Sequence, residues 1–395
     1  MFKRLTLSLS LLLLSSCAKK EEGIAAGPNF EKDLQTALIQ AKSGAVIELP
    51  EGVFPMTGTL SLTVANVTIR GKGIGKTVLS YKNQTSGAAG IQATGDHFTL
   101  EGLTIQDTKG DGVKINDVDG VTIRKVRAEW TGGPNEKNGS YGIYPVKCKN
   151  VLIEDSASSG AADAGIYVGQ SKNIIVRRSR AEFNVAGIEI ENSEGADVYE
   201  NVATNNAGGL LVFSLPDLPV KGSRQTRVFN NQVFANNTPN FAPKGNIVAK
   251  VPTGTGIIVM ATHQAEVFGN DIHDNDTVNV SIISYLSTGN PMNDATYDPF
   301  VSQVSLHDNK IGAGGTKPAG VAAELIAPKY GKALPGIMWD GIAKGDPQIC
   351  IHNNGDTGFL NYDAGGEFKK MSTDLKSHSC SLPALAAIEL PGGTR

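Results

Sequence analysis

Gly165-Ile166-Tyr167-Val168 is one of six segments in which a glycine precedes alternating apolar residues. The other five are Gly90-Ile91, Gly112-Val113-Lys114-Ile115, Gly142-Ile143-Tyr144, Gly187-Ile188-Glu189-Ile190 and Gly209-Leu210-Leu211-Val212. Successive glycines lie 22, 30, 23, 22 and 22 residues apart. A period of this length is typical of stacked repeats, in which each turn buries its apolar residues against its neighbours. The repeats therefore predict a solenoid.

The residues within each repeat indicate strands. The first and third residues after the glycine are expected to point inward, and the second and fourth outward. A second apolar pair, such as Ile174 and Val176, follows about nine residues later, which suits three short strands per turn. An Asn or Ser recurs fourteen residues after the glycine, as Ser156, Ser179, Asn201 and Asn270, with Asn231 and Asn309 in equivalent phrases. We expect these polar residues to stack inside a corner of the coil.

The ends of the solenoid are predicted as follows. Residues 29–44 resemble an amphipathic helix, with Phe30, Leu34 and Leu38 on one face, and such a helix would cover the open end of the coil. The β-helix is expected over residues 29–312. A loop-rich region, residues 313–395, is expected to complete it. The predicted fold class is therefore all-β, a parallel β-helix with an N-terminal capping helix.

The first residues look like an export signal. Lys3 and Arg4 precede a short apolar run that ends at Leu14. The sequence Leu14-Ser15-Ser16-Cys17 resembles a bacterial lipobox, which implies a signal peptide over residues 1–16 and a lipid bilayer contact through acylated Cys17. An ordinary secretory signal with Cys17 inside it is the alternative. Residues 17–28 are then a lipidated cysteine and tether, and Ala18 implies outer-membrane sorting.

Composition and residue spacing limit which partners and cofactors are expected. The net charge of −3 shows no basic excess, so nucleic acid is not an expected partner. The six histidines are scattered without metal-ligand spacing, so neither a metal site nor a cofactor is predicted. Cys350 and Cys380 flank a Gly- and Asn-rich stretch and are candidates for a disulfide, although spacing alone does not determine the pairing.

Phrases such as Gly165-Ile166-Tyr167-Val168 followed by Asn173-Ile174-Ile175-Val176 resemble the right-handed parallel β-helix proteins, the pectin-lyase-like group. The resemblance covers roughly residues 29–312. Gly139 to Val146, Asn184 to Asn192 and Val212 to Pro216 look more narrowly like exported bacterial β-helix lipoproteins of unsettled function. That family tends to be encoded beside a multihaem c-type cytochrome, which implies an envelope protein as a partner.

Insertions into the repeat predict where a site lies. Extra residues fall near 131–140, 214–224, 238–253 and 287–299, before or after the glycine-containing strand. All four are expected to rise beside one face of the solenoid, where long loops on a rigid scaffold would carry function. Two such walls would form a groove suited to an extended polymer.

The outward residues of the glycine-containing strands would form the groove floor, and they change in character from turn to turn. Tyr144 and Tyr167, one turn apart, are predicted to stack as a sugar-binding platform, with Asn116 as a further substrate contact. The alternative is a ladder of aromatic rings that only stabilises the sheet. The apolar residues that follow, Leu211, Phe213, Ile258 and Met260, are expected to be covered by the insertions at 214–224 and 238–253.

Three carboxyl groups and one cation are the candidate catalytic groups. Glu189 and Glu191 share the outward face, Asp163 lies at the entrance to its strand, and Lys114 is the expected cation. Two glutamates on a solvated face without a role remain the alternative. Alginate epimerases of this fold carry an Asp-Pro-His-Asp motif that is absent from this chain, so lyase, epimerase and glycoside hydrolase activities all stay open. A non-enzymatic scaffold that docks a protein such as a c-type cytochrome is the second class of function.

Overall fold

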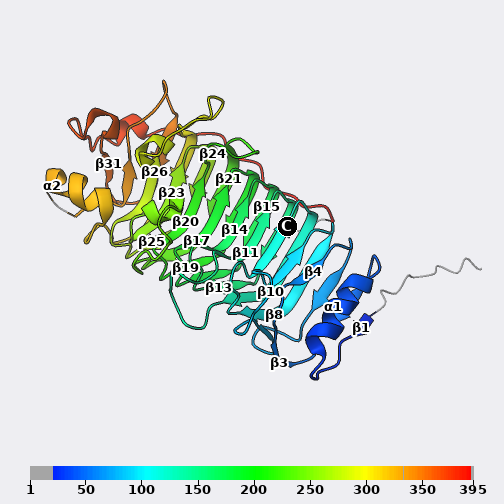
Figure 1. Ribbon diagram of the computed structural model, residues 1–395. Helices are drawn as coiled ribbons and strands as arrows, with labels where there is room; N and C mark the ends of the chain where they lie inside the picture. The colour runs from blue at the N-terminus through cyan, green and yellow to red at the C-terminus, as the bar shows by residue number, and fades with distance from the viewer. Residues whose placement is uncertain (1–20, 332, 393–395) are drawn as a thin grey trace, which may run out of the picture.

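The computed structural model describes residues 21–331 and 333–392 as one long coil of parallel strands (Figure 1). Three strands per turn build three flat faces, which belong to an 11-stranded and a 20-stranded sheet. The predicted all-β parallel coil is therefore confirmed. The signal peptide and Cys17 lie outside the described residues. Within the described ranges, no helix has the length and apolar character needed to cross a bilayer.

We call the 11-stranded sheet the glycine-strand sheet, because it contains the six segments that define the repeat. Its strands, in spatial order, are β4 (Leu60–Leu62), β7 (Ile91–Ala93), β9 (Val113–Asn116), β11 (Tyr141–Val146), β14 (Ala164–Gly169), β17 (Ala186–Glu191), β20 (Gly208–Phe213), β23 (Thr255–Met260), β26 (Val278–Ile283), β29 (Ile337–Trp339) and β31 (Phe359–Asn361).

The 20-stranded sheet forms the two other faces. One face contains β1 (Glu21–Gly23), β2 (Val46–Glu48), β5 (Thr68–Arg70), β8 (Phe98–Gln106), β10 (Asp119–Glu129), β12 (Lys149–Glu154), β15 (Lys172–Arg177), β18 (Glu194–Tyr199), β21 (Ser223–Phe229), β24 (Thr262–Phe268), β27 (Ser302–His307) and β30 (Ile349–His352). The other contains β3 (Gly52–Pro55), β6 (Thr77–Ser80), β13 (Ala157–Ser159), β16 (Arg180–Glu182), β19 (Val202–Thr204), β22 (Gln232–Phe234), β25 (Asp271–His273) and β28 (Lys310–Ile311). The long strands β8 and β10 run through both faces.

Close stacking of successive turns explains the repeated glycine. A Cβ atom on Gly142 would lie 2.5 Å from the carbonyl oxygen of Gly165, and one on Gly187 would lie 2.5 Å from that of Gly209. No side chain can occupy such a gap without moving the backbone of the next turn. The glycine column therefore sets how closely the turns approach each other.

Asparagine ladders fill the corners, as the sequence predicts for one of them. The Nδ2 atoms of Asn201, Asn231, Asn270 and Asn309 each donate to the Oδ1 atom of the next ladder residue at 3.0, 2.9, 2.8 and 2.9 Å. A second ladder, which was not predicted, joins Asn184, Asn206, Asn236 and Asn275. Both ladders satisfy buried amides that would otherwise be costly to bury.

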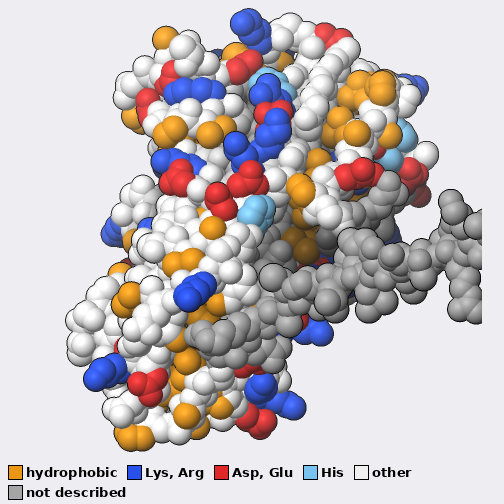
Figure 2. Space-filling model, turned by 90° about the vertical axis from the view of Figure 1, so that its right-hand side faces the viewer, with side chains coloured by type: hydrophobic (Ala, Val, Ile, Leu, Met, Phe, Trp, Pro, Cys, Tyr) orange, Lys and Arg blue, Asp and Glu red, His pale blue; other side chains and the backbone are white. Residues whose placement is uncertain are grey.

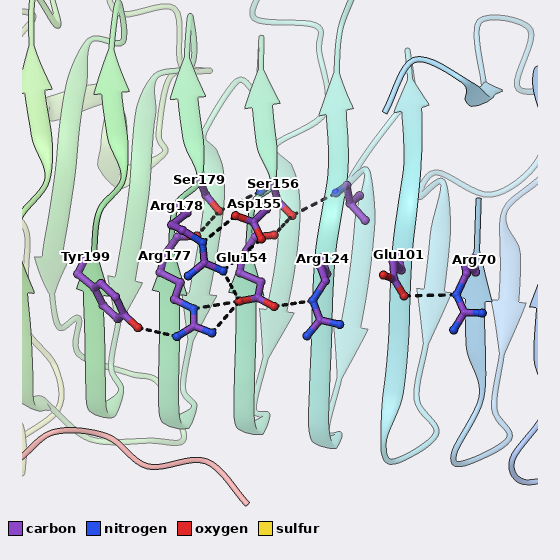
Figure 3. A network of polar contacts seen from close by, with 11 residues as sticks. Arg70, Glu101, Arg124, Glu154, Asp155, Ser156, Arg177, Arg178, Ser179 and Tyr199 are labelled. Carbon is purple, nitrogen blue, oxygen red and sulfur yellow. Dashed lines mark hydrogen bonds and ion pairs between the residues drawn. The ribbon is translucent and has the colours of Figure 1, made fainter. Parts of the chain in front are cut away.

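Charged and aromatic side chains form a row on the outer face of β5 to β30. At its centre, the buried carboxylate of Glu154 accepts hydrogen bonds from Arg124, Arg177 and Arg178 (Figure 3). These partners lower the pKa of Glu154 to about 2, although its burial alone would raise it. Figure 2 shows Lys and Arg interspersed with Asp and Glu on the face turned to the viewer, without a broad patch of one sign.

The N-terminal end of the coil is covered by a helix, as predicted, and a short strand precedes that helix in the chain. Helix α1 (Phe30–Gln40) buries Phe30, Leu34 and Leu38 against the first turns. Residues 17–28 were expected to form a tether throughout, whereas Glu21–Gly23 pair with β2 as strand β1. The free edge of β2 offers unpaired backbone groups, and the preceding segment satisfies them.

The C-terminal region continues the coil through β29, β30 and β31 and then turns back along it. Cys350 on β30 forms a disulfide with Cys380, the pairing that the spacing left open. From there an extended tail runs along the outside of the coil (Figure 1). Its backbone amides at Leu385 and Ile388 donate to Glu266 and Asp197. Close to the end of the described chain, Leu390 packs against Leu152 and Ile175.

Candidate functional site

The register of the glycine-strand sheet places four predicted residues in one outward row. Lys114 on β9 pairs with Tyr144 on β11, and Tyr167 on β14 pairs with Glu189 on β17. The rings of Tyr144 and Tyr167 lie 4.9 Å apart, which joins the two halves of the row. Glu191 occupies the next outward position of β17. Strand alternation thus brings the predicted residues to one face, as expected.

Loops close over part of this face, as expected for its apolar residues but not for its carboxyl groups, which were expected on an open groove floor. Leu215, Val251 and Tyr297, from three of the four predicted insertions, pack on the outward apolar residues of β20 and β23. The cover extends over the carboxyl groups, because Glu189 is 1% and Glu191 7% exposed. The predicted cover of the apolar residues is therefore confirmed, whereas the open groove is wrong at Glu189 and Glu191, which the cover also removes from water.

Three carboxyl groups lie buried beneath the loops with few partners. Tyr167 Oη donates to Glu191 Oε1 at 3.0 Å. Tyr141 Oη and Asn246 Nδ2 both donate to Asp163 Oδ2, at 3.4 and 3.3 Å. Glu189 Oε1 has no hydrogen-bond partner in the described part of the chain. We call Asp163, Glu189 and Glu191 the carboxyl cluster.

Burial raises the pKa of all three carboxyl groups in the cluster. Burial, with the charge of Glu191 as the second cause, raises the pKa of Asp163 to about 7, although Tyr141 and Asn246 partly oppose the shift. Burial also raises the pKa of Glu191 to about 7 against the opposing bond from Tyr167. The pKa of Glu189 rises well above its ordinary value, by burial and by the two neighbouring carboxyl groups. Carboxyl groups with a pKa near 7 can give and take protons at neutral pH.

The tyrosine rings do not form the predicted platform. Tyr144 and Tyr167 meet edge to face at 61°, and Tyr167 is 3% exposed, so it positions Glu191 and offers no surface to a sugar. Tyr141, which was not predicted, stacks on Tyr144 with ring centroids 4.3 Å apart. Tyr141 and Tyr144 are both half-buried, and they form the accessible side of the cluster. Burial raises the pKa of Tyr144 to about 12.

Lys114 differs from its expected role as the cation facing the carboxyl groups. Its Nζ atom lies 3.5 Å from Asp111 and 5.4 Å from the Tyr144 ring centroid. Among the described residues, no ion pair joins Lys114 to a member of the carboxyl cluster. Asp111 precedes β9 and lies three residues before Lys114, so it is the nearer carboxylate along the chain. Asn116 Oδ1 is buried and has no hydrogen-bond partner among the described residues.

Two residues of the site were missed from the sequence. Tyr141 pairs with Ala164, which pairs with Ala186, so it is the bulky member of a column of small residues. An alignment of the repeats would show this single tyrosine among small residues, and it could have identified Tyr141 as unusual. Asn246 comes from the insertion at 238–253, which has no repeat pattern, so nothing in the sequence places it beside Asp163.

Comparison with known proteins agrees with this architecture. The sequence model described as "Right handed beta helix region" matches residues 55–224. The A-modules of the mannuronan C-5 epimerases AlgE4 and AlgE6 from Azotobacter vinelandii have similar structures. AlgE4 superimposes with a TM-score of 0.55 and 17% identity, covering 82% of this chain and 90% of that chain. AlgE6 superimposes with a TM-score of 0.50 and 16% identity, covering 82% and 89%.

A curated relative by sequence is the probable pectinesterase/pectinesterase inhibitor 17 of Arabidopsis thaliana, which is 33% identical over 109 residues. The match covers 25% of this chain and 21% of the relative, so the chain spans about a fifth of that protein's length. Identities below 25% to the solved structures show the fold alone. The strand register and the matched segment together show that the chain folds as a right-handed parallel β-helix.

Proposed function

We propose that the protein binds an extended carbohydrate over Tyr141 and Tyr144 and exchanges protons with it through Asp163 and Glu191. The observation that carries this proposal is the carboxyl cluster itself. Three acids are buried together without a cation among the described residues, at a cost that a purely structural site would not need to bear. Groups with such perturbed pKa values concentrate at catalytic sites.

The similar proteins support the class of substrate. Their names identify mannuronan epimerases and a pectinesterase, all of which act on carbohydrate polymers. A solenoid face of many parallel strands presents equivalent positions about every 4.8 Å, which suits a polymer with repeating units. The experiment described below identifies which bond of the carbohydrate is changed.

The two carboxyl groups are suited to opposite roles in one proton relay. With pKa values of about 7, one of them can be ionised while the other holds its proton at neutral pH. Tyr167 stabilises ionised Glu191 by donating to it, and Tyr141 does the same for Asp163. A cation beside the two carboxyl groups would favour their ionised state. Without one, both groups can still gain and lose a proton near neutral pH.

Access to the cluster involves the segment 238–253. Asn246 of this segment holds Asp163 from the outside. We infer that a bound carbohydrate displaces the Asn246 amide and takes its hydrogen bond to Asp163. The half-buried rings of Tyr141 and Tyr144 then provide apolar contact for the sugar.

The test uses isosteric variants of the two acids. Glu191→Gln and Asp163→Asn each keep an oxygen that can accept from the neighbouring tyrosine, but neither can transfer a proton. Glu51→Gln, at an exposed position, is the matched control. Each purified protein is incubated with mannuronan, pectin and neutral polysaccharides, and the products are followed by NMR and by size.

We expect the wild type and Glu51→Gln to convert one polymer, with a rate loss of about 10²-fold or more for the two acid variants. Equal rates in all four proteins would remove the carboxyl cluster from the chemistry. Binding without conversion by the wild type would restrict the function to carbohydrate recognition.

We also propose that the protein is exported and anchored through acylated Cys17. The support is the charged start, the short apolar run and the small residues before Cys17. Mass spectrometry of the mature protein should find a lipid-modified Cys17 at the N-terminus, and Cys17→Ser should abolish membrane association. An unmodified N-terminus after a different cleavage site would contradict the proposal.

A further inference from the structure

A second region of the glycine-strand sheet carries an apolar cleft that the carboxyl cluster does not use. A cavity of about 610 Å³ lies on the outer face of β23, β26 and β29, closed by residues 249–255 and 319–326. A smaller cavity of about 70 Å³ lies over β20 and β23. Both cavities contact Val251, Ile258 and Ile283, so they lie side by side beneath the same segment, and we refer to them together as the cleft.

The lining of the cleft is mainly aliphatic and aromatic. Its floor includes Leu211, Phe213, Ile258 and Met338, and Phe368 contributes from the opposite side. From β23 to the residue that follows β31, the floor of the larger cavity crosses three steps between strands, or roughly 14 Å. A volume of this size is typical of ligand sites, which are largely apolar with a few polar groups.

One exposed apolar residue lies in the lining of the larger cavity. Val321 is 50% exposed and lines the cavity. An exposed apolar side chain at such a cavity is suited to contact with an apolar ligand.

One cation borders both cavities. The Lys250 ammonium is held by two neutral oxygens, the carbonyl of Thr288 and Oδ1 of Asn290. No carboxylate forms an ion pair with it among the described residues. The other charged residue of the lining is Glu324. Its side chain is exposed, and it lines the larger cavity but not the smaller one. The charge at the junction of the two cavities is therefore positive and not neutralised.

We propose that this cleft binds a single-chain amphiphile with an anionic head, of the fatty-acid type. The aliphatic chain lies along the floor of the larger cavity from Ile258 to Tyr362, and the head meets Lys250 at the junction with the smaller cavity. The apolar lining, the exposed Val321 and the unpaired cation each match a part of this ligand. The lining of the cleft does not include Asp163 or Glu191, so the two proposals can be tested with separate variants.

The test uses palmitate, with hexadecanol as a probe of the same chain without the charge. The full-length protein is freed of lipid and titrated with each probe, and binding is measured by calorimetry and native mass spectrometry. Ser281→Leu is designed to fill the floor of the larger cavity between Ile258 and Met338. Ser61→Leu is the matched control, at an exposed outward position of β4 far from the cleft.

We expect one palmitate per chain, at least tenfold weaker binding in Ser281→Leu, and unchanged binding in Ser61→Leu. Lys250→Met should weaken palmitate about tenfold and leave hexadecanol unchanged, and it tests the site even if Ser281→Leu does not fold. The proposal would be overturned if neither substitution weakened the binding of palmitate, or if the wild type did not bind palmitate. Preference for a two-chain phospholipid over palmitate would overturn the assigned ligand.

Discussion

Raising the pH from about 5 to about 7 is expected to destabilise the folded protein at the carboxyl cluster. Burial raises the pKa of Asp163 and of Glu191 to about 7 in the folded chain. Unfolded carboxyl groups have a pKa of about 4. Each group therefore binds its proton more tightly when the chain is folded. Its contribution to stability is complete at low pH and is lost as the pH rises towards 7.

The size of this loss follows from the two pKa values. Between about pH 5 and 7, a group whose pKa rises from about 4 to about 7 on folding loses about 2 kcal/mol of stabilisation. Glu191 contributes to the raised pKa of Asp163, so the two losses are not independent. We expect a combined loss of about 2–4 kcal/mol. For a chain of 395 residues this corresponds to a decrease of about 2–5 °C in the unfolding midpoint.

The assay is thermal unfolding by calorimetry across this range of pH. Other groups also titrate, so the wild type is compared with the double variant Asp163→Asn/Glu191→Gln, which cannot ionise at either position. The double variant should lose less stability between pH 5 and 7, by the amount above. Glu51→Gln should behave like the wild type, because the position is exposed.

Parallel curves of stability against pH for the wild type and the double variant would refute this reasoning. They would mean that the two acids ionise as easily in the folded chain as in the unfolded one. Water or a counter-ion would then have to reach the cluster, and the proton relay would lose its physical basis.

Three further predictions concern the scaffold. Asn270→Ala should cost about 2–4 kcal/mol in denaturant unfolding, because it leaves buried ladder groups unsatisfied, whereas exposed Asn83→Ala should cost under about 0.5 kcal/mol. Gly142→Ala should lower the unfolding midpoint or prevent folding, because its Cβ would lie 2.5 Å from a carbonyl oxygen of the next turn; Gly132→Ala, with open space around it, should be neutral. Leu390→Ala should speed hydrogen exchange of the tail amides without altering that of the coil, because this side chain anchors the tail. A global loss of protection in that variant would show that the tail supports the coil itself.

The sequence predicts the coil well because one physical constraint recurs in every turn. The glycine column is fixed by backbone contact between turns, and the alternation that follows determines which residues face outward. The row from Lys114 to Glu189 could therefore be predicted residue by residue. The disulfide between Cys350 and Cys380 could be named only as a candidate, since its geometry depends on the path of the tail.

The parts of the site that escaped prediction depend on the insertions. No repeat determines where residues 238–253 lie, so neither the contact of Asn246 with Asp163 nor the burial of Glu189 follows from spacing. The sequence leaves two interpretations open for Glu189 and Glu191, catalytic groups or a solvated pair without a role. The loops that cover them bury both side chains, which is inconsistent with a solvated pair.

The apolar region and the acid cluster are physically linked at one step of the sheet. Leu211 pairs with Glu189 and Phe213 pairs with Glu191, so the outward row changes from acidic to apolar between β17 and β20. The loops cover the apolar side because burying it is favourable, and the same cover removes water from the neighbouring acids. The largest cause of the raised pKa values of Asp163 and Glu191 is thus burial, to which residues without charge contribute. The inward strand positions of a solenoid must stay apolar in every turn, whereas the outward positions can change from one turn to the next. The candidate chemistry lies at such a change, between β17 and β20.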